Sequence, residues 1–267
     1  MALKIVVLAK QVPDTRNVGK DAVTAEGTVN RAALPAIFNP EDLNALEQAL
    51  RLKEQNPGST VGILTMGPPR AGEIIRQGLY RGADTGWLLT DRLFAGADTL
   101  ATSYALATAI KKIGDVDIVI GGRQAIDGDT AQVGPQISEH LNIPVISYAE
   151  EIKVDGDSVI VKRQFDDRYH MLKAKMPCLI TALSELNKPR YMTPGGILDA
   201  FNAEITVWSR DDLKTLDDSN MGLKGSPTQI AKASDKVAKG AGEKFVPDSA
   251  NDAAQFIISK LAEKHVI

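Results

Sequence analysis

Five apolar runs, separated by segments with helical periodicity, constrain the fold of this chain more than any other feature of its sequence. The runs cover residues 3–9, 60–66, 85–90, 117–122 and 143–149. Unbroken apolar runs of this length are typical of parallel strands that are buried on both faces. The repeated order of strand and helix predicts an α/β fold. It consists of a mostly parallel sheet flanked by helices, with the parallel core ending near residue 150.

Helix start signals lie between these runs. Asn39 precedes a proline and a stripe of leucines, so we expect it to cap a helix over residues 39–54. Asp98 precedes a second helical pattern in the same way. A third pattern begins near Asp129, which Gln132 follows at the spacing of a capping box.

The pattern changes after residue 150. Alternating apolar and polar residues, interrupted by the turn signals "DGD" and "DDR", predict antiparallel strands to about residue 185. The following region is mostly polar and is poorly suited to fold on its own, so it stays loose or wraps a partner. We therefore expect a domain over residues 1–200 and a C-terminal arm, ending in a helix, over residues 201–267.

Composition excludes several classes of function. A net charge of −3 and a pI of about 5.7 give no indication of nucleic-acid binding or of an anionic membrane surface. One cysteine, Cys178, cannot close a disulfide within the chain or hold an iron–sulfur cluster, and the three histidines lack metal-ligand spacing. No signal peptide and no membrane-spanning run is evident. We expect a soluble protein of a reducing compartment, the cytoplasm, with no metal and no membrane insertion.

The loop "GGRQAIDGDTAQVGPQ", residues 121–136, follows the fourth apolar run. Gly121 and Gly122 allow a ligand to approach the backbone closely, and free N–H groups at the start of the next helix attract phosphate. Pro135 implies either that this helix begins later than Asp129 or that its first turn is loosened. The loop predicts a nucleotide site at the carboxyl edge of the sheet, although an ordinary strand–loop–helix connection would have a similar composition.

Other residues are expected at the same edge. Arg123 and Asp127 can hold phosphate oxygens and ribose hydroxyls. Capping and core packing are alternative explanations for the remaining residues, which are Asn39, Asp42, Thr65, Met66, Asp98, Thr99 and Thr102. The chain has no phosphate-loop, dinucleotide-fingerprint or nucleophile-elbow motif. A pocket without acid–base machinery is typical of a protein that holds a redox cofactor whose own ring does the chemistry.

Several segments resemble the β subunit of electron transfer flavoproteins. They are "KIVVLAKQVPDT", "NPED" followed by "NALEQALRLKE", "MGPP", "GRQAIDGDTAQVGPQ" and "LNKPRY". The resemblance covers nearly the whole chain. It implies a fold of the adenine-nucleotide α-hydrolase-like kind and an arm that embraces an α subunit carrying an electron-transferring FAD.

The resemblance also implies where ligands and partners bind. "LNKPRY" lies in a partner-recognition loop, residues 184–195, with Leu186 at its tip. The implied nucleotide pocket adds several residues to those above. It comprises Leu8, Ala9, Lys10, Asn39, Asp42, Met66, Gly122, Arg123, Gln124, Ala125, Ile126, Asp127, Gly128, Asp129, Thr130, Ala131, Gln132 and Val133.

Two branches of this family differ in the ligand of the pocket. Simple electron carriers bind AMP there, whereas electron-bifurcating members bind a second FAD. NADH reduces that FAD, and one electron goes to ferredoxin or flavodoxin while the other goes through the α-subunit FAD to a dehydrogenase. Gly128 and Thr130 stand where AMP-binding relatives often carry bulkier or acidic residues, and "GADTLAT" at residues 96–102 is similar to the flavin-binding members. These features favour the bifurcating type, with an AMP-binding carrier as the alternative.

Two further expectations concern the partner and the flavin. "MTPGGILDAF", residues 192–201, replaces a lysine-rich stretch of many relatives, which leaves the partner open between an enoyl-CoA reductase of acyl-CoA dehydrogenase type and a flavin-dependent hydroxy-acid dehydrogenase. Arg123 is expected to place positive charge near the flavin ring and favour its anionic reduced form, although a contact with phosphate or with a carboxylate is an equal alternative.

Overall fold

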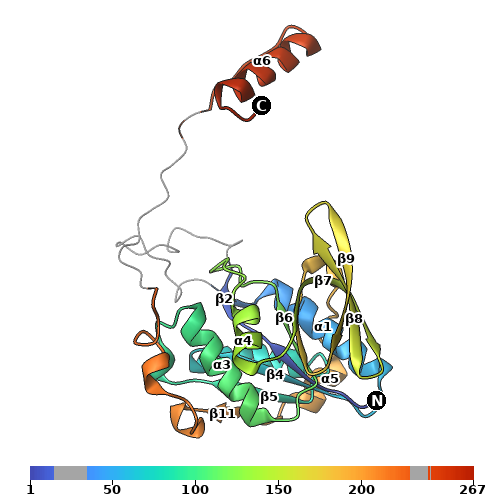
Figure 1. The fold of residues 1–267 in the computed structure, drawn as a ribbon, viewed down its shortest axis with the longest axis vertical. Helices are drawn as coiled ribbons and strands as arrows, with labels where there is room; N and C mark the ends of the chain where they lie inside the picture. Colours follow the sequence, from blue (N-terminus) through green and yellow to red (C-terminus); the bar gives the residue numbers. More distant parts are fainter. Residues whose placement is uncertain (15–34, 229–239, 241) are drawn as a thin grey trace.

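The computed structural model describes residues 1–14, 35–228, 240 and 242–267, and its described strands build one large sheet and one small one (Figure 1). The large sheet has nine strands in the order β11-β5-β4-β1-β6-β10-β7-β8-β9, and the small sheet pairs β2 with β3. The strands are Lys4–Leu8 (β1), Gln11–Pro13 (β2), Ala36–Phe38 (β3), Thr60–Met66 (β4), Thr85–Leu89 (β5), Ile118–Gly122 (β6), Val145–Asp155 (β7), Ser158–Phe165 (β8), Arg168–Lys175 (β9), Cys178–Ala182 (β10) and Thr206–Trp208 (β11).

The central strands are parallel, as the apolar runs predicted. Every neighbouring pair from β11 to β7 is parallel, and only β8 and β9 continue the sheet in antiparallel fashion. The predicted α/β fold with a mostly parallel sheet is therefore confirmed. The turns at "DGD" and "DDR" connect β7 to β8 and β8 to β9, where the sequence placed them.

The described helices are Pro40–Gln55 (α1), Gly72–Leu79 (α2), Thr99–Ile113 (α3), Val133–Leu141 (α4), Pro194–Ala200 (α5) and Ala250–Glu263 (α6), with short 3₁₀ helices at Pro69–Ala71 (η2), Arg92–Phe94 (η3), Ser184–Leu186 (η4), Arg210–Asp212 (η5) and Asp218–Asn220 (η6). Helices α1 and α2 pack on one face of the sheet and α3 and α4 on the other, whereas no residue of α6 is buried. None of the described helices combines the length and apolar character needed to span a lipid bilayer.

Strand β1 shows why these runs are apolar on both faces of the sheet. Ile5 and Val7 pack into the core that contains α1 and α2, whereas Val6 and Leu8 pack into the core that contains α3 and α4. Alternate residues of a strand face opposite sides, so a strand between two helical layers must be apolar throughout. Full burial of each such side chain stabilises the fold by roughly 1.5–3 kcal/mol.

One strand differs from the prediction. The segment Cys178–Ala182, expected to continue the antiparallel strands, forms β10, which lies between β6 and β7 and runs parallel to both. All of its residues are buried. A short apolar run without alternation is typical of a buried parallel strand, and this signal distinguishes it from the antiparallel strands before it.

The region beyond residue 200 contributes to the same core. Strand β11 pairs in parallel with β5, and Trp208, Leu213, Leu216 and Met221 are buried in the core on the α3 side. The residues that directly follow the expected boundary between domain and arm at residue 200 therefore pack on the sheet. The C-terminal helix α6 was expected, and its N-cap is Ser249.

Candidate functional site

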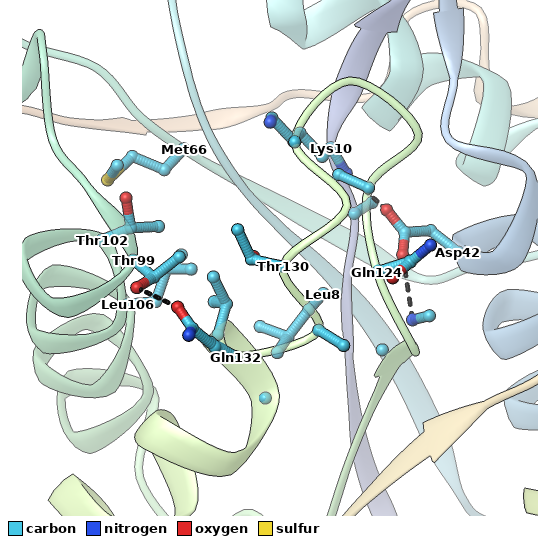
Figure 2. Close-up of a pocket in the computed structure, with 18 of the residues that line it drawn as sticks. Leu8, Lys10, Asp42, Met66, Thr99, Thr102, Leu106, Gln124, Thr130 and Gln132 are labelled. Carbon is cyan, nitrogen blue, oxygen red and sulfur yellow. Dashed lines mark hydrogen bonds between the residues drawn. The ribbon is translucent and has the colours of Figure 1, made fainter. Parts of the chain in front are cut away.

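A cavity of about 400 Å³ opens where β1, β4 and β6 end, between the first turns of α3 and α4. Parallel sheets bind ligands at this edge because loops and helix N-termini gather there. Figure 2 shows Met66, Thr99, Thr102 and Leu106 on one side of the cavity and Lys10, Asp42 and Gln124 on the other. Thr130 and Leu8 lie between them, and Gln132 lies against Thr99.

Most of the residues predicted for a nucleotide site line this one cavity. They are Leu8, Ala9, Lys10, Asp42, Met66, Asp98, Thr99, Thr102, Gly122, Arg123, Gln124, Ala125, Gly128, Thr130, Ala131, Gln132 and Val133. Segments from five separate parts of the sequence (residues 8–10, 42, 66, 98–102 and 122–133) therefore converge on one cavity.

Five predicted residues lie outside the lining. Asn39 and Ile126 bond to each other in the layer behind the pocket wall, where the Asn39 Oδ1 accepts a hydrogen bond from the Ile126 N–H. Asp127 pairs with a lysine, and Asp129 accepts a hydrogen bond from the Gln124 side chain. Thr65 is fully buried, and strand alternation turns it away from the face that Met66 presents to the cavity.

The cavity also has walls that the sequence did not predict. These residues are Leu64, Phe94, Leu106, Leu179 and Thr181, whereas Gly96, Ala97, Gly121 and Gly134 belong to the loops that the sequence had indicated. Leu64 could have been found from its spacing of two from Met66. Leu179 and Thr181 could not, because they belong to β10, whose place beside β6 was not predicted.

The first turn of α1 holds the loop that follows β6. One oxygen of Asp42 accepts a hydrogen bond of 2.8 Å from the Lys10 N–H, and the other accepts one of 2.9 Å from the Gly122 N–H. This carboxylate therefore joins the ends of β1 and β6. Burial raises the pKa of Asp42 to about 7, against the lowering effect of these hydrogen bonds.

Asn39 supports the same loop. It occupies the N-cap position of α1, as predicted, but its side chain makes no capping hydrogen bond. Instead its Nδ2 donates to the Gln124 carbonyl at 2.9 Å, and its Oδ1 accepts from the Ile126 N–H at 3.1 Å. A residue type suited to capping thus serves a tertiary contact.

Helix α4 begins at Val133, which corrects the expected start near Asp129. No capping box forms, because Gln132 is the N-cap residue and makes no side-chain cap. Pro135 falls in the first turn, where it removes no helical hydrogen bond. The first turn contains no acidic residue, so its N–H groups offer an anion site at the cavity wall.

The first turn of α3 has a different character. The Asp98 side chain accepts hydrogen bonds from the N–H groups of Leu100 and Ala101 and from that of Thr228, so it acts as the predicted cap. A carboxylate there neutralises the positive end of the helix dipole. The hydroxyls of Thr99 and Thr102 remain as the polar groups that α3 presents to the cavity. Of these two helix ends, α4 is the one suited to phosphate.

The cations of the lining are paired. The Lys10 Nζ lies 2.7 Å from the Asp127 carboxylate, and the Arg123 Nη2 lies 2.9 Å from the Glu41 carboxylate. The sequence did not predict this pairing of Glu41, which also accepts a hydrogen bond from the Gln124 N–H. Burial raises the pKa of Glu41, partly offset by its bonds with Gln124 and Arg123.

The segment "LNKPRY" is fixed to α1. The Arg190 Nε donates to Glu47 at 2.7 Å, and its Nη1 donates to Glu54. Burial alone would raise the pKa of Glu47, but its hydrogen bonds with Arg190 and Arg51 hold that pKa below its usual value. Leu186, expected at an exposed tip, is half-buried against the core because the turn η4 folds it inward.

Comparison with known proteins matches residues 26–213 to the electron transfer flavoprotein domain. The chain is 50% identical over 265 residues to the caffeyl-CoA reductase-Etf complex subunit CarD of Acetobacterium woodii, which covers 99% of this chain and 100% of that protein. It is also 50% identical over 265 residues to the electron transfer flavoprotein subunit beta of Clostridium acetobutylicum, with the same coverage. The acryloyl-CoA reductase electron transfer subunit gamma of Anaerotignum propionicum is 45% identical over 271 residues, with 99% of this chain and 100% of that protein covered.

Proposed function

Because the chain belongs to the electron transfer flavoprotein family as one of its β subunits, we propose that its pocket holds a flavin adenine dinucleotide and serves electron bifurcation. The bound FAD would supply redox chemistry, accepting a hydride from NADH and delivering single electrons to ferredoxin or flavodoxin and, through the FAD of an α subunit, to a partner dehydrogenase.

One observation carries the proposal. The residues that favoured a dinucleotide, Asp98, Thr99 and Thr102, line the same cavity as the loop after β6. A mononucleotide at the α4 N-terminus has no further phosphate or ribitol oxygens to reach the hydroxyls of α3. A dinucleotide provides them, and its phosphates suit the uncapped first turn of α4.

The remaining residues have supporting roles in this proposal. Asp42 and Asn39 hold the loop after β6 so that its backbone approaches the nucleotide, and Lys10 with Asp127 forms the rim of the pocket. Arg123 offers a donor to the flavin. The walls that contain Leu106, Phe94 and Leu179 exclude water from the cavity.

The proposed partners follow from the relatives and from exposed parts of the chain. Relatives named as subunits of caffeyl-CoA and acryloyl-CoA reductase systems favour an enoyl-CoA reductase over a hydroxy-acid dehydrogenase. We assign the contact with this reductase to residues 184–195, with Leu186 as the contact residue after a local rearrangement. The C-terminal arm, including α6, contacts the α subunit, and the complex works in the cytoplasm.

A ligand count on the complex tests the proposal. The chain is co-expressed with its α subunit, the complex is denatured, and released FAD and AMP are quantified per heterodimer. Two FAD and no AMP support the proposal, and NADH-driven reduction of ferredoxin is then the activity to measure. One FAD and one AMP would instead identify a non-bifurcating carrier with a structural AMP.

A further inference from the structure

Each positively charged side chain of the described pocket lining forms an ion pair with a carboxylate. Lys10 faces Asp127, and Arg123 faces Glu41. The lining carboxylates have backbone donors, since Asp42 bonds to two N–H groups and Asp98 caps α3. The positive potential available to a phosphate therefore comes from the first turn of α4 and not from a side chain.

Arg123 combines a compensated charge with an unused donor. Its Nη2 bonds to Glu41, but its Nε is buried and has no hydrogen-bond partner among the described residues. A buried donor without an acceptor is costly, and because Arg123 lines the cavity, a bound ligand can supply the missing acceptor.

Glu41 is held in place independently of Arg123. Its second oxygen accepts a hydrogen bond of 3.1 Å from the Gln124 N–H, and the residue is 9% exposed on the first turn of α1. The carboxylate is thus attached both to the helix and to the loop that it serves. Its position fixes the guanidinium relative to the pocket.

We propose that Glu41 is a positioning residue that cancels the charge of Arg123, so that the guanidinium acts on a bound flavin as a hydrogen-bond donor and not as a positive charge. The inference rests on the proposed function, because it assigns the acceptor to the flavin. It changes the expectation for Arg123: the pair does not stabilise an anionic reduced ring by net charge, and it does not recruit phosphate.

The test is the two-electron potential of the pocket flavin in the complex with the α subunit, whose own flavin is an internal reference. Glu41→Gln keeps a side-chain acceptor for the Gln124 N–H but removes the negative charge. The freed positive charge should raise the potential of the pocket flavin and leave that of the α-subunit flavin unchanged. Arg123→Gln should lower the pocket potential, and the double variant should lie between the two.

A matched control lies on the same helix. Glu54→Gln makes the same chemical change where the carboxylate pairs with Arg190 instead of Arg123. Its pocket potential should equal that of the wild type. If Glu41→Gln shifts the potential no more than Glu54→Gln does, the charge-cancelling role of Glu41 is overturned, even though the flavin is present.

If the pocket holds AMP, the proposed function is overturned, but the charge-cancelling role of Glu41 can still be tested. If the wild-type complex contains AMP in place of a second FAD, the affinities of the emptied pocket for AMP and adenosine replace the potential. Glu41→Gln should then tighten AMP by about fivefold to tenfold through the uncompensated cation and leave adenosine unchanged. An equal effect on both ligands would overturn the inference.

Discussion

The Thr99 hydroxyl donates a hydrogen bond of 2.9 Å to the side-chain oxygen of Gln132, and so links the first turn of α3 to the N-cap residue of α4 (Figure 2). Both residues line the cavity. The bond lies between the two helix ends that differ in character, one capped by a carboxylate and the other uncapped. A ligand that reaches from α4 to α3 must exchange this bond for bonds of its own.

Thr99→Val tests whether the ligand spans the two helices. The substitution removes the donor and nearly preserves the shape, and one lost hydrogen bond of about 1 kcal/mol weakens FAD by about fivefold. AMP affinity should not change, because AMP ends at α4. The measurement is titration of the emptied complex with each nucleotide. Thr108→Val is the control, since the Thr108 hydroxyl bonds to the Tyr104 carbonyl within α3. Equal losses for AMP and FAD would show that Thr99 only shapes the wall.

Gly122→Ala tests the close approach of the loop to α1. A Cβ at Gly122 would lie 2.5 Å from the Asp42 Oδ1 and 2.8 Å from the backbone carbon of Glu41, so the strand end or the helix must move. We expect the free energy of unfolding to fall by about 2 kcal/mol and nucleotide to be lost from the purified complex.

Gly128→Ala is the matched control for that substitution. A Cβ at Gly128 would meet no heavy atom within 4 Å, and the change should alter the free energy of unfolding by less than about 0.5 kcal/mol. Urea unfolding of both variants provides the comparison. Similar destabilisation by the two substitutions would contradict the role of Gly122 as a contact point.

Local sequence patterns predicted the elements of this fold better than their contacts. The apolar run of β1 and the cap at Asp98 are decided by neighbours in sequence, and both form as expected. Strand β10 was placed wrongly because its partners β6 and β7 precede it by long intervening segments. The amino-acid composition of this run does not indicate which strands will be its neighbours in the sheet.

The same limit applies to the site. Strand ends showed that Met66 and Gln132 would reach one cavity, because parallel strands bring their carboxyl ends to one edge. The hydrogen-bond and ion-pair partners of individual side chains could not be predicted. Asn39 is a residue type that commonly caps helices, but its side chain forms a hydrogen bond with Gln124 instead. Nothing in the sequence indicated that Glu41 would pair with Arg123.

Arg190→Ala tests whether the segment fixed to α1 serves partner docking. The variant loses the bonds to Glu47 and Glu54, so the segment should become less ordered. We expect the KM for the partner reductase to rise by roughly tenfold through a loss of about 1.4 kcal/mol, with unchanged flavin content and an unchanged kcat at saturation. Lys153→Ala, which alters an exposed side chain of β7 outside residues 184–195, is the control. A loss of flavin without a change in KM would indicate that Arg190 stabilises the fold and not the docking surface.

The pH dependence of stability tests the burial of Asp42. Its pKa is about 7 in the folded chain, whereas an unfolded aspartate titrates near 3.9. Between these values the folded state holds a proton that the unfolded state lacks, so stability falls as pH rises and is constant above about pH 7. The uncharged Asp42→Asn variant lacks this effect. From pH 5 to pH 8 the free energy of unfolding of the wild type should therefore decrease relative to that of the variant by about 3 kcal/mol. Urea unfolding of both proteins at each pH measures this difference. A difference independent of pH would show that Asp42 is already ionised in the folded protein at pH 5, stabilised by the Lys10 and Gly122 N–H groups.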